Sequence, residues 1–221
     1  MSTPFVVAID GPSGSGKSST ARGVARRLGF GYLDTGAMYR AVTWALLRRE
    51  VDTGDAAAVA AAVGEVQTVS GTDPDAPTIT ADGVDVSVEI RGPEVVAHVS
   101  PVSAVPEVRT RLVELQRQAI AAAGEGIVVE GRDIGTVVAT DAPLKIFLTA
   151  DTAARAARRA AEEGSGDTAA TAASLERRDQ IDSTRTTSPL AKADDAVEID
   201  TTDLTLDEVV DEIVTLVWER R

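Results

Sequence analysis

The chain has 221 residues, 43% hydrophobic and 26% charged, which is typical of one globular domain or of one domain with an insertion. It has no cysteine and one histidine, His98, which excludes disulfides, thiolate nucleophiles, cysteine-based zinc sites and multi-histidine metal sites. The formal net charge of −13 opposes binding to phosphate backbones, so we expect no nucleic-acid partner.

The sequence gives no sign of a membrane or secretory segment. No apolar run approaches the roughly 18 residues that a membrane-spanning helix needs. Residues 1–10 lack the basic start and the small-residue cleavage site of a secretory signal. We therefore expect a cytoplasmic protein with no membrane partner, and we interpret His98 as a structural residue.

The first predicted elements are a strand, a glycine-rich loop and a helix. Residues 5–9 form a short, continuous apolar run rich in β-branched side chains, as in a strand of a parallel sheet buried on both faces. Three glycines lie between residues 11 and 16, and residues 18–28 have a helical pattern that ends before Gly29. This order predicts the start of a βαβ unit.

The glycine-rich loop matches the pattern G-x-x-x-x-G-K-[ST] at every fixed position. Its glycines let backbone N–H groups approach a polyphosphate, and the following helix adds the positive end of its dipole. We expect Lys17 on the β- and γ-phosphates and the Ser18 hydroxyl on Mg²⁺. The residues predicted to bind the nucleoside triphosphate are Gly11, Pro12, Ser13, Gly14, Ser15, Gly16, Lys17, Ser18 and Ser19.

Further strands alternate with helices along the chain. Strands are expected at residues 32–34, 127–130, 144–148 and 196–199, and helices at 37–49, 107–122 and 152–163. Thr205 and Glu208 form a capping box, and one apolar stripe follows at Leu206, Val209, Val210, Ile213 and Val217. The alternation predicts a doubly wound α/β fold with a five-stranded parallel sheet.

Residues 64–100 do not fit this alternation. The Asp82-Gly83 dipeptide lies between two β-rich runs, residues 78–81 and 84–87, which predicts an antiparallel hairpin. We interpret the region as a small inserted subdomain, although a surface hairpin without a function has the same pattern.

Residues 155–185 combine an arginine-rich helix, a loose segment at 164–167 and a second group of arginines. Long segments of this kind often close over active sites. The pattern predicts a lid, and a solvated pair of charged helices is the alternative.

Two classes of P-loop protein fit the sequence poorly. Residues 191–194, Ala-Lys-Ala-Asp, lack the Asn or Thr that begins the guanine-binding motif of GTPases. Residues 128–133, Val-Val-Glu-Gly-Arg-Asp, have an arginine close behind the strand, unlike the Walker-B strand of a motor or an ABC-type ATPase.

Several segments instead resemble bacterial cytidylate kinases, a family of P-loop nucleoside monophosphate kinases. Residues 33–40, Leu-Asp-Thr-Gly-Ala-Met-Tyr-Arg, are similar to the family's monophosphate-binding motif. Residues 130–138 and 141–148 are similar to its second signature, and the arginines of residues 155–185 match its lid pattern. The resemblance covers essentially the whole chain. Glu130 stands where the family often has Asp, and Thr35 where it often has Ser.

The resemblance implies a single P-loop kinase domain. Its core would be residues 1–62, 101–154 and 187–221, with an antiparallel monophosphate-binding insertion at 63–100 and a helical lid at 155–186. It also implies a monomer that transfers the ATP γ-phosphoryl group to CMP or dCMP with Mg²⁺, giving ADP and CDP or dCDP.

The resemblance also implies roles for individual residues. Arg40, Arg132 and Thr35 would hold the acceptor phosphate, and Asp133, Arg109 and Ser100 would read the base. Arg155, Arg158 and Arg178 would close over the transferring group. The implied catalytic residues are Lys17, Arg132, Arg155, Arg158, Arg178 and Arg185. The implied CMP-binding residues are Thr35, Arg40, Ser100, Arg109, Arg132, Asp133, Arg178, Asp182 and Arg185, with Asp182 on the sugar.

Some alternatives stay open at this point. Asp34 either holds Mg²⁺ through water or caps a helix, and each lid arginine could simply form a surface salt bridge. Another small-molecule P-loop kinase, of the shikimate or AMP type, remains possible as a class, although an Asp-Gly-Phe-Pro-Arg-like segment is absent. A regulatory ATP-binding module without transfer activity is the second alternative.

Overall fold

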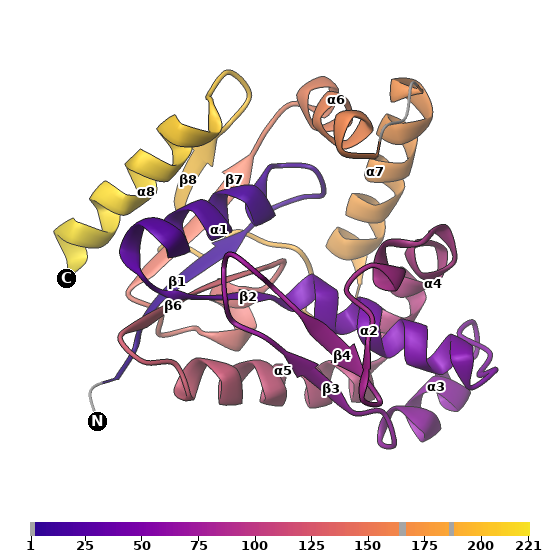
Figure 1. Ribbon diagram of the computed structural model, residues 1–221. Helices are drawn as coiled ribbons and strands as arrows, with labels where there is room; N and C mark the ends of the chain where they lie inside the picture. Colours follow the sequence, from indigo (N-terminus) through magenta and orange to yellow (C-terminus); the bar gives the residue numbers. More distant parts are fainter. Residues whose placement is uncertain (1–2, 164–166, 186–187) are drawn as a thin grey trace.

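A five-stranded parallel sheet forms the centre of the computed structural model, which describes residues 3–163, 167–185 and 188–221 (Figure 1). The strand order is β2-β6-β1-β7-β8, and every neighbouring pair is parallel. The strands are β1 (Phe5–Asp10), β2 (Gly31–Asp34), β6 (Gly126–Gly131), β7 (Leu144–Thr149) and β8 (Val197–Asp200). The predicted α/β fold is confirmed.

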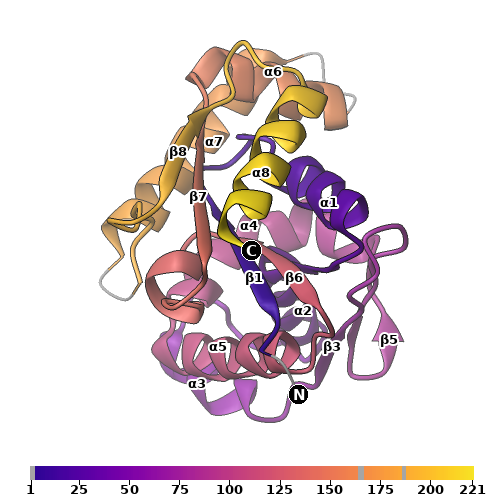
Figure 2. The same ribbon diagram turned by 90° about the vertical axis from the view of Figure 1, so that its left-hand side faces the viewer.

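Helices cover both faces of this sheet (Figures 1 and 2). The alternation of side chains along β1 shows the two layers: Val7 and Ile9 pack in one apolar core, and Val6 and Ala8 in the other. The first core is shared with α1 (Lys17–Leu28) and α8 (Leu206–Arg220), and the second with α2 (Thr35–Arg48) and α5 (Pro106–Ala121).

The last helix, α8, begins as the sequence predicts. The side chain of Glu208 accepts from the Thr205 backbone N–H at 2.8 Å, and the Thr205 hydroxyl accepts from the Glu208 N–H at 3.3 Å. Val209, Val210, Ile213 and Val217 are buried. The prediction is wrong for Leu206, which is 48% exposed.

The inserted region contains more structure than the sequence predicts. The hairpin is confirmed: Asp82 (φ 50°) and Gly83 (φ 79°) form its two-residue turn, and both take the positive φ values of a type I′ turn. Helix α3 (Ala56–Val63) precedes the region, whose elements are β3 (Thr68–Ser70), β4 (Ile79–Ala81), β5 (Val84–Asp85), a 3₁₀ turn (Glu89–Arg91) and α4 (Pro93–Ala104). The backbone N–H of Tyr32 donates to the carbonyl oxygen of Thr72 at 2.8 Å, which ties the insertion to the sheet edge.

Two helices, α6 (Thr152–Glu163) and α7 (Thr168–Thr184), pack together at the end of the sheet from which the phosphate loop projects (Figure 1). Helix α4 runs past the expected boundary at residue 100, and α6 begins before residue 155, so these helices straddle the expected divisions. In the part of the chain that the structure describes, no helix is long and apolar enough to cross a membrane.

Candidate functional site

The predicted phosphate loop connects β1 to α1, and its backbone conformation requires glycine. Gly16 has φ 85° directly before the helix begins at Lys17. A Cβ atom on Gly11 would lie 2.2 Å from the carbonyl oxygen of Leu148, which no side chain could tolerate. The loop therefore has the close-packed shape expected of a cradle for phosphate oxygens.

Lys17 is buried in this loop. Its Nζ donates to the carbonyl oxygen of Pro12 at 2.6 Å, and the residue is 6% exposed. Burial and the nearby positive charge of Arg132 lower the pKa of the Lys17 ammonium group to about 7. A polyphosphate beside Nζ would raise this pKa again, because negative charge favours the protonated amine.

Ser18 lies beside a carboxylate that the sequence analysis did not assign a role. The Ser18 hydroxyl donates to Glu130 Oε2 at 2.9 Å, and the Tyr32 hydroxyl donates to Oε1. Burial and the charge of Asp34 raise the pKa of Glu130. A hydroxyl and a carboxylate at the end of the phosphate loop are the hard oxygen ligands that suit Mg²⁺. Glu130 lies near the end of β6, and its place at the end of a predicted strand was the signal that could have identified it.

Asp34 is engaged as a helix cap. Its Oδ1 accepts from the Ala37 backbone N–H at 2.8 Å, and its Oδ2 accepts from Arg40 at 3.0 Å. Both carboxylate oxygens therefore have partners at the start of α2. This geometry supports the helix-cap interpretation, and Glu130 is the carboxylate that contacts Ser18.

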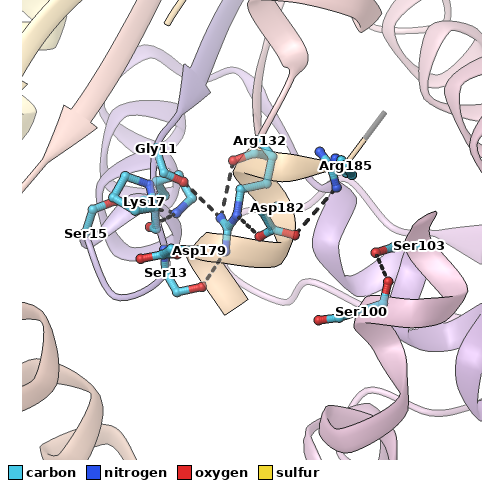
Figure 3. A network of polar contacts seen from close by, with 12 residues as sticks. Gly11, Ser13, Ser15, Lys17, Ser100, Ser103, Arg132, Asp179, Asp182 and Arg185 are labelled. Carbon is cyan, nitrogen blue, oxygen red and sulfur yellow. Dashed lines mark hydrogen bonds and ion pairs between the residues drawn. The ribbon is translucent and has the colours of Figure 1, made fainter. Parts of the chain in front are cut away.

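Arg132 connects the end of β6 to the phosphate loop (Figure 3). Its guanidinium donates to the Gly11 carbonyl oxygen at 3.0 Å and to Ser13 Oγ at 2.7 Å, and its Nε donates to Asp182 at 2.9 Å. Asp182 is on α7 and also lies 3.6 Å from Arg185. One arginine thus bridges the phosphate loop and α7.

A second contact between the helices and the loop involves Asp179 of α7. The Ser13 backbone N–H donates to Asp179 Oδ1 at 2.9 Å, and Arg155 of α6 forms an ion pair with the other oxygen of the carboxylate. Arg155 also donates to the Ser13 carbonyl oxygen at 2.9 Å. The sequence placed Arg155 at the site but gave no role to Asp179.

The other predicted lid arginines have different partners. Arg158 donates to Thr201 Oγ1 at 2.8 Å, in the connection between β8 and α8. Arg185 donates to the Ser188 carbonyl oxygen, and burial lowers its pKa. Arg158 and Arg185 are therefore held by the chain itself in this conformation.

Four arginines from separate segments surround one small cavity. Its volume is about 50 Å³, and its walls include Arg40 of α2, Arg91 of the insertion, and Arg159 and Arg178 of the two lid helices. Burial and the charge of Arg132 lower the pKa of Arg178 to about 10. So much positive charge around one space fits an anionic group. The sequence analysis missed Arg91, because an isolated arginine in a chain rich in arginine carries no signal. It counted Arg159 among the lid arginines without giving it a role at the site.

Arg109 and Asp133 form a buried ion pair, with 3% and 4% of their surfaces exposed. The Arg109 guanidinium lies over the ring of Tyr39, 5.4 Å from its centre, and donates to the Ser103 carbonyl oxygen at 3.4 Å. Ser103 Oγ in turn donates to the Ser100 carbonyl oxygen at 2.9 Å (Figure 3). Of the three residues predicted to read a base, the structure thus pairs Arg109 with Asp133 directly and links Ser100 to Arg109 through Ser103.

The remaining predicted residues are close to these groups or on the surface. The Thr35 hydroxyl donates to the Glu130 carbonyl oxygen at 2.7 Å and is buried. Ser19 is exposed on the first turn of α1. His98 Nδ1 forms a hydrogen bond of 2.6 Å with Thr53, in agreement with a structural role.

Comparisons with known proteins identify similar chains. A family model described as cytidylate kinase matches residues 7–219. A cytidylate kinase of Streptomyces avermitilis is 60% identical over 216 residues, which are 98% of this chain and 94% of that protein. A cytidylate kinase of Nocardia farcinica is 58% identical over 222 residues, which are 99% of this chain and 95% of that protein.

Solved structures share the fold at low identity. An uncharacterised protein from Eubacterium ventriosum has a TM-score of 0.54 and 14% identity, with 98% of this chain and 99% of that chain covered. A gluconokinase from Sinorhizobium meliloti has a TM-score of 0.51 and 16% identity, with 100% and 95% covered. These likenesses concern the architecture alone.

Proposed function

We propose that this chain, which belongs to the cytidylate kinase family, transfers the γ-phosphoryl group of ATP to CMP or dCMP. The observation that carries the proposal is Arg132, which contacts the phosphate loop while its chain neighbour Asp133 pairs with Arg109. A donor site and a site able to read a base are thereby joined by two consecutive residues. The products are ADP and CDP or dCDP.

The donor is held by the phosphate loop. Backbone N–H groups of the loop and the Lys17 ammonium group would bind the β- and γ-phosphates. Ser18 and Glu130 would hold Mg²⁺, with Asp34 reaching it only through water. Bound Mg²⁺ supplies positive charge that neutralises the phosphate oxygens during transfer.

The acceptor phosphate would occupy the arginine-lined cavity. Arg40 and Arg178, with Arg91 and Arg159, offer several guanidinium groups to its oxygens, and Arg132 would lie between donor and acceptor. The acceptor is already an anion, so no strong base is required. Catalysis then consists of holding two anions in line and neutralising their charge.

Base and sugar would be read on the other side of Arg132. Cytosine presents an amine donor and an N3 acceptor, which complement the Asp133 carboxylate and the Arg109 guanidinium. Ser100 is connected to Arg109 through Ser103. Asp182, which pairs with Arg132, would bind a sugar hydroxyl. Water-free surroundings strengthen this recognition, because both members of the ion pair are buried.

An acceptor panel tests the proposed function. With ATP and Mg²⁺, we expect ADP formation with CMP and dCMP, a much lower rate with UMP, and no reaction with AMP or shikimate. A coupled assay of ADP measures all five. Preference for AMP or shikimate would overturn the proposal, and ATP binding without ADP formation would indicate a regulatory module instead.

We propose that α6 and α7 act as a lid over this site, with residues 63–100 as the acceptor-binding insertion. Asp179, Arg155 and the Arg132–Asp182 pair are the contacts that would rearrange as phosphates enter. Amide hydrogen exchange in both helices is expected to slow when a bisubstrate analogue binds, because closure excludes water. Unchanged exchange in both helices would contradict the lid assignment.

The monomeric state and the cytoplasmic location stay predictions from the sequence.

A further inference from the structure

The last residue of β1, Asp10, is a buried carboxylate that the proposed mechanism does not use. It is 4% exposed, and burial raises its pKa to about 6. Its Oδ1 accepts from the backbone N–H of Ile134 and its Oδ2 from that of Gly135, each at 2.8 Å. A carboxylate kept in such surroundings lowers stability at neutral pH, so its retention calls for a reason.

The place of Asp10 in the fold gives that reason. Gly11, its next neighbour in the chain, begins the phosphate loop, and Gly131 lies opposite Asp10 in the β1–β6 register. The two amides that Asp10 binds come directly after Asp133, at the start of the turn Ile134–Val138. The carboxylate therefore fixes the backbone immediately after Asp133.

A carboxylate suits this position better than its neutral analogues. Two consecutive N–H groups point at Asp10, and each needs an acceptor. Aspartate offers one oxygen to each, whereas asparagine offers one oxygen and an amine that would face the second N–H. An unpaired buried amide is costly, so the backbone at residues 133–135 would shift.

We propose that Asp10 is a positioning residue for acceptor recognition, which fixes Asp133 against Arg109 by holding the two backbone amides that follow Asp133. The inference rests on the proposed function. Asp10 acts through the backbone and touches no substrate. Asp10 ends the central strand β1, where it lies between the phosphate loop and the segment that follows Asp133.

The test is Asp10→Asn, assayed with CMP and UMP over a range of ATP concentrations. We expect kcat/KM for CMP to fall about ten- to a hundredfold, as for lost transition-state contacts. UMP should lose less than about threefold, because it gains little from Asp133, and the KM for ATP should change by less than about threefold. The ratio of kcat/KM for CMP to kcat/KM for UMP should therefore fall.

A matched control separates positioning from general loss of stability. Ile213→Val removes one methylene group from the core on the α8 side of the sheet, where Ile213 is fully buried. It should lower the melting temperature while leaving the CMP to UMP ratio unchanged. Thermal unfolding of both variants shows whether the Asp10→Asn protein is folded at the assay temperature.

Other outcomes would overturn the inference. Equal losses for CMP and UMP would mean that Asp10 has only a structural role. A raised KM for ATP with an unchanged ratio would place its effect on the phosphate loop. If the variant does not fold, amide hydrogen exchange in the wild-type protein provides the test. The amides of Ile134 and Gly135 should be as protected as those of β6, and rapid exchange would show that Asp10 does not hold them. Failure of the wild-type protein to phosphorylate CMP would instead contradict the proposed function.

Discussion

Substitution of Lys17 by alanine is expected to abolish phosphoryl transfer while the fold is retained. The change removes a buried charge from the β- and γ-phosphates, and groups of this kind contribute about 3–5 kcal/mol to transition-state stabilisation. That corresponds to a loss of turnover of about two to four orders of magnitude. The fold should survive, because burial already disfavours the ammonium group and lowers its pKa to about 7.

Turnover with CMP, measured on protein shown to be folded by thermal unfolding, checks this expectation. Lys192 provides the control, since Lys192→Ala makes the same change of charge on the surface, where the lysine pairs with Glu198 at 2.8 Å. That variant should match the wild type. More than about a tenth of wild-type turnover in folded Lys17→Ala protein would remove Lys17 from the catalytic residues.

The second large effect is expected for Asp133→Ala, and it should depend on the base. With CMP, loss of the carboxylate removes the acceptor for the cytosine amine, and kcat/KM should fall by about ten- to several-hundredfold. With UMP the loss should be much smaller, because a carbonyl no longer faces a carboxylate. The preference for CMP over UMP then falls, chiefly because kcat/KM for CMP is lowered.

Both acceptors must be measured at saturating ATP and well below the unfolding temperature. The buried ion pair makes this necessary, because alanine at residue 133 leaves Arg109 buried without its partner, and breaking such pairs costs about 3–5 kcal/mol. Asp133→Asn retains the size of the side chain and serves as the matched variant. An equal fall in kcat/KM for CMP and for UMP would show that Asp133 does not read the base.

Short sequence patterns predicted the turns, the helix cap and the glycine-rich loop, because each of these depends on residues that are neighbours in the chain. The glycine pattern around residues 11–16, the Asp82-Gly83 turn and the Thr205 capping box each depend on neighbouring residues, and each has the expected geometry. Leu206 shows the limit of a periodic pattern. Leu206 is the first residue of α8, and it is exposed although the four later members of its stripe are buried.

The contacts of the site could not be predicted in the same way. Ser18 and Glu130 are 112 residues apart, and Ser13 and Asp179 are 166 residues apart, so their pairing depends on the strand order and on the docking of α7. Arg91 has no local signature, and Arg159 was only one of the arginines that match the lid pattern. Only the folded chain brings the two to one cavity. The sequence placed Arg158 among the lid arginines but could not predict its partner, Thr201. A long, flexible side chain can reach partners in several directions.

The bond between Tyr32 and Thr72 has a consequence for the chain as a whole. An unpaired strand at the rim of a sheet is a template on which another molecule can add its own strand, which is a common route to aggregation. Here the backbone N–H of Tyr32 on β2 is taken by Thr72 of the insertion. The opposite rim, β8, has four residues and exposes the charged side chains of Glu198 and Asp200, which are costly to cover with an incoming strand. The insertion therefore also occupies a backbone donor on the β2 rim of the sheet, and a chain shortened there would leave that N–H free to pair with another molecule.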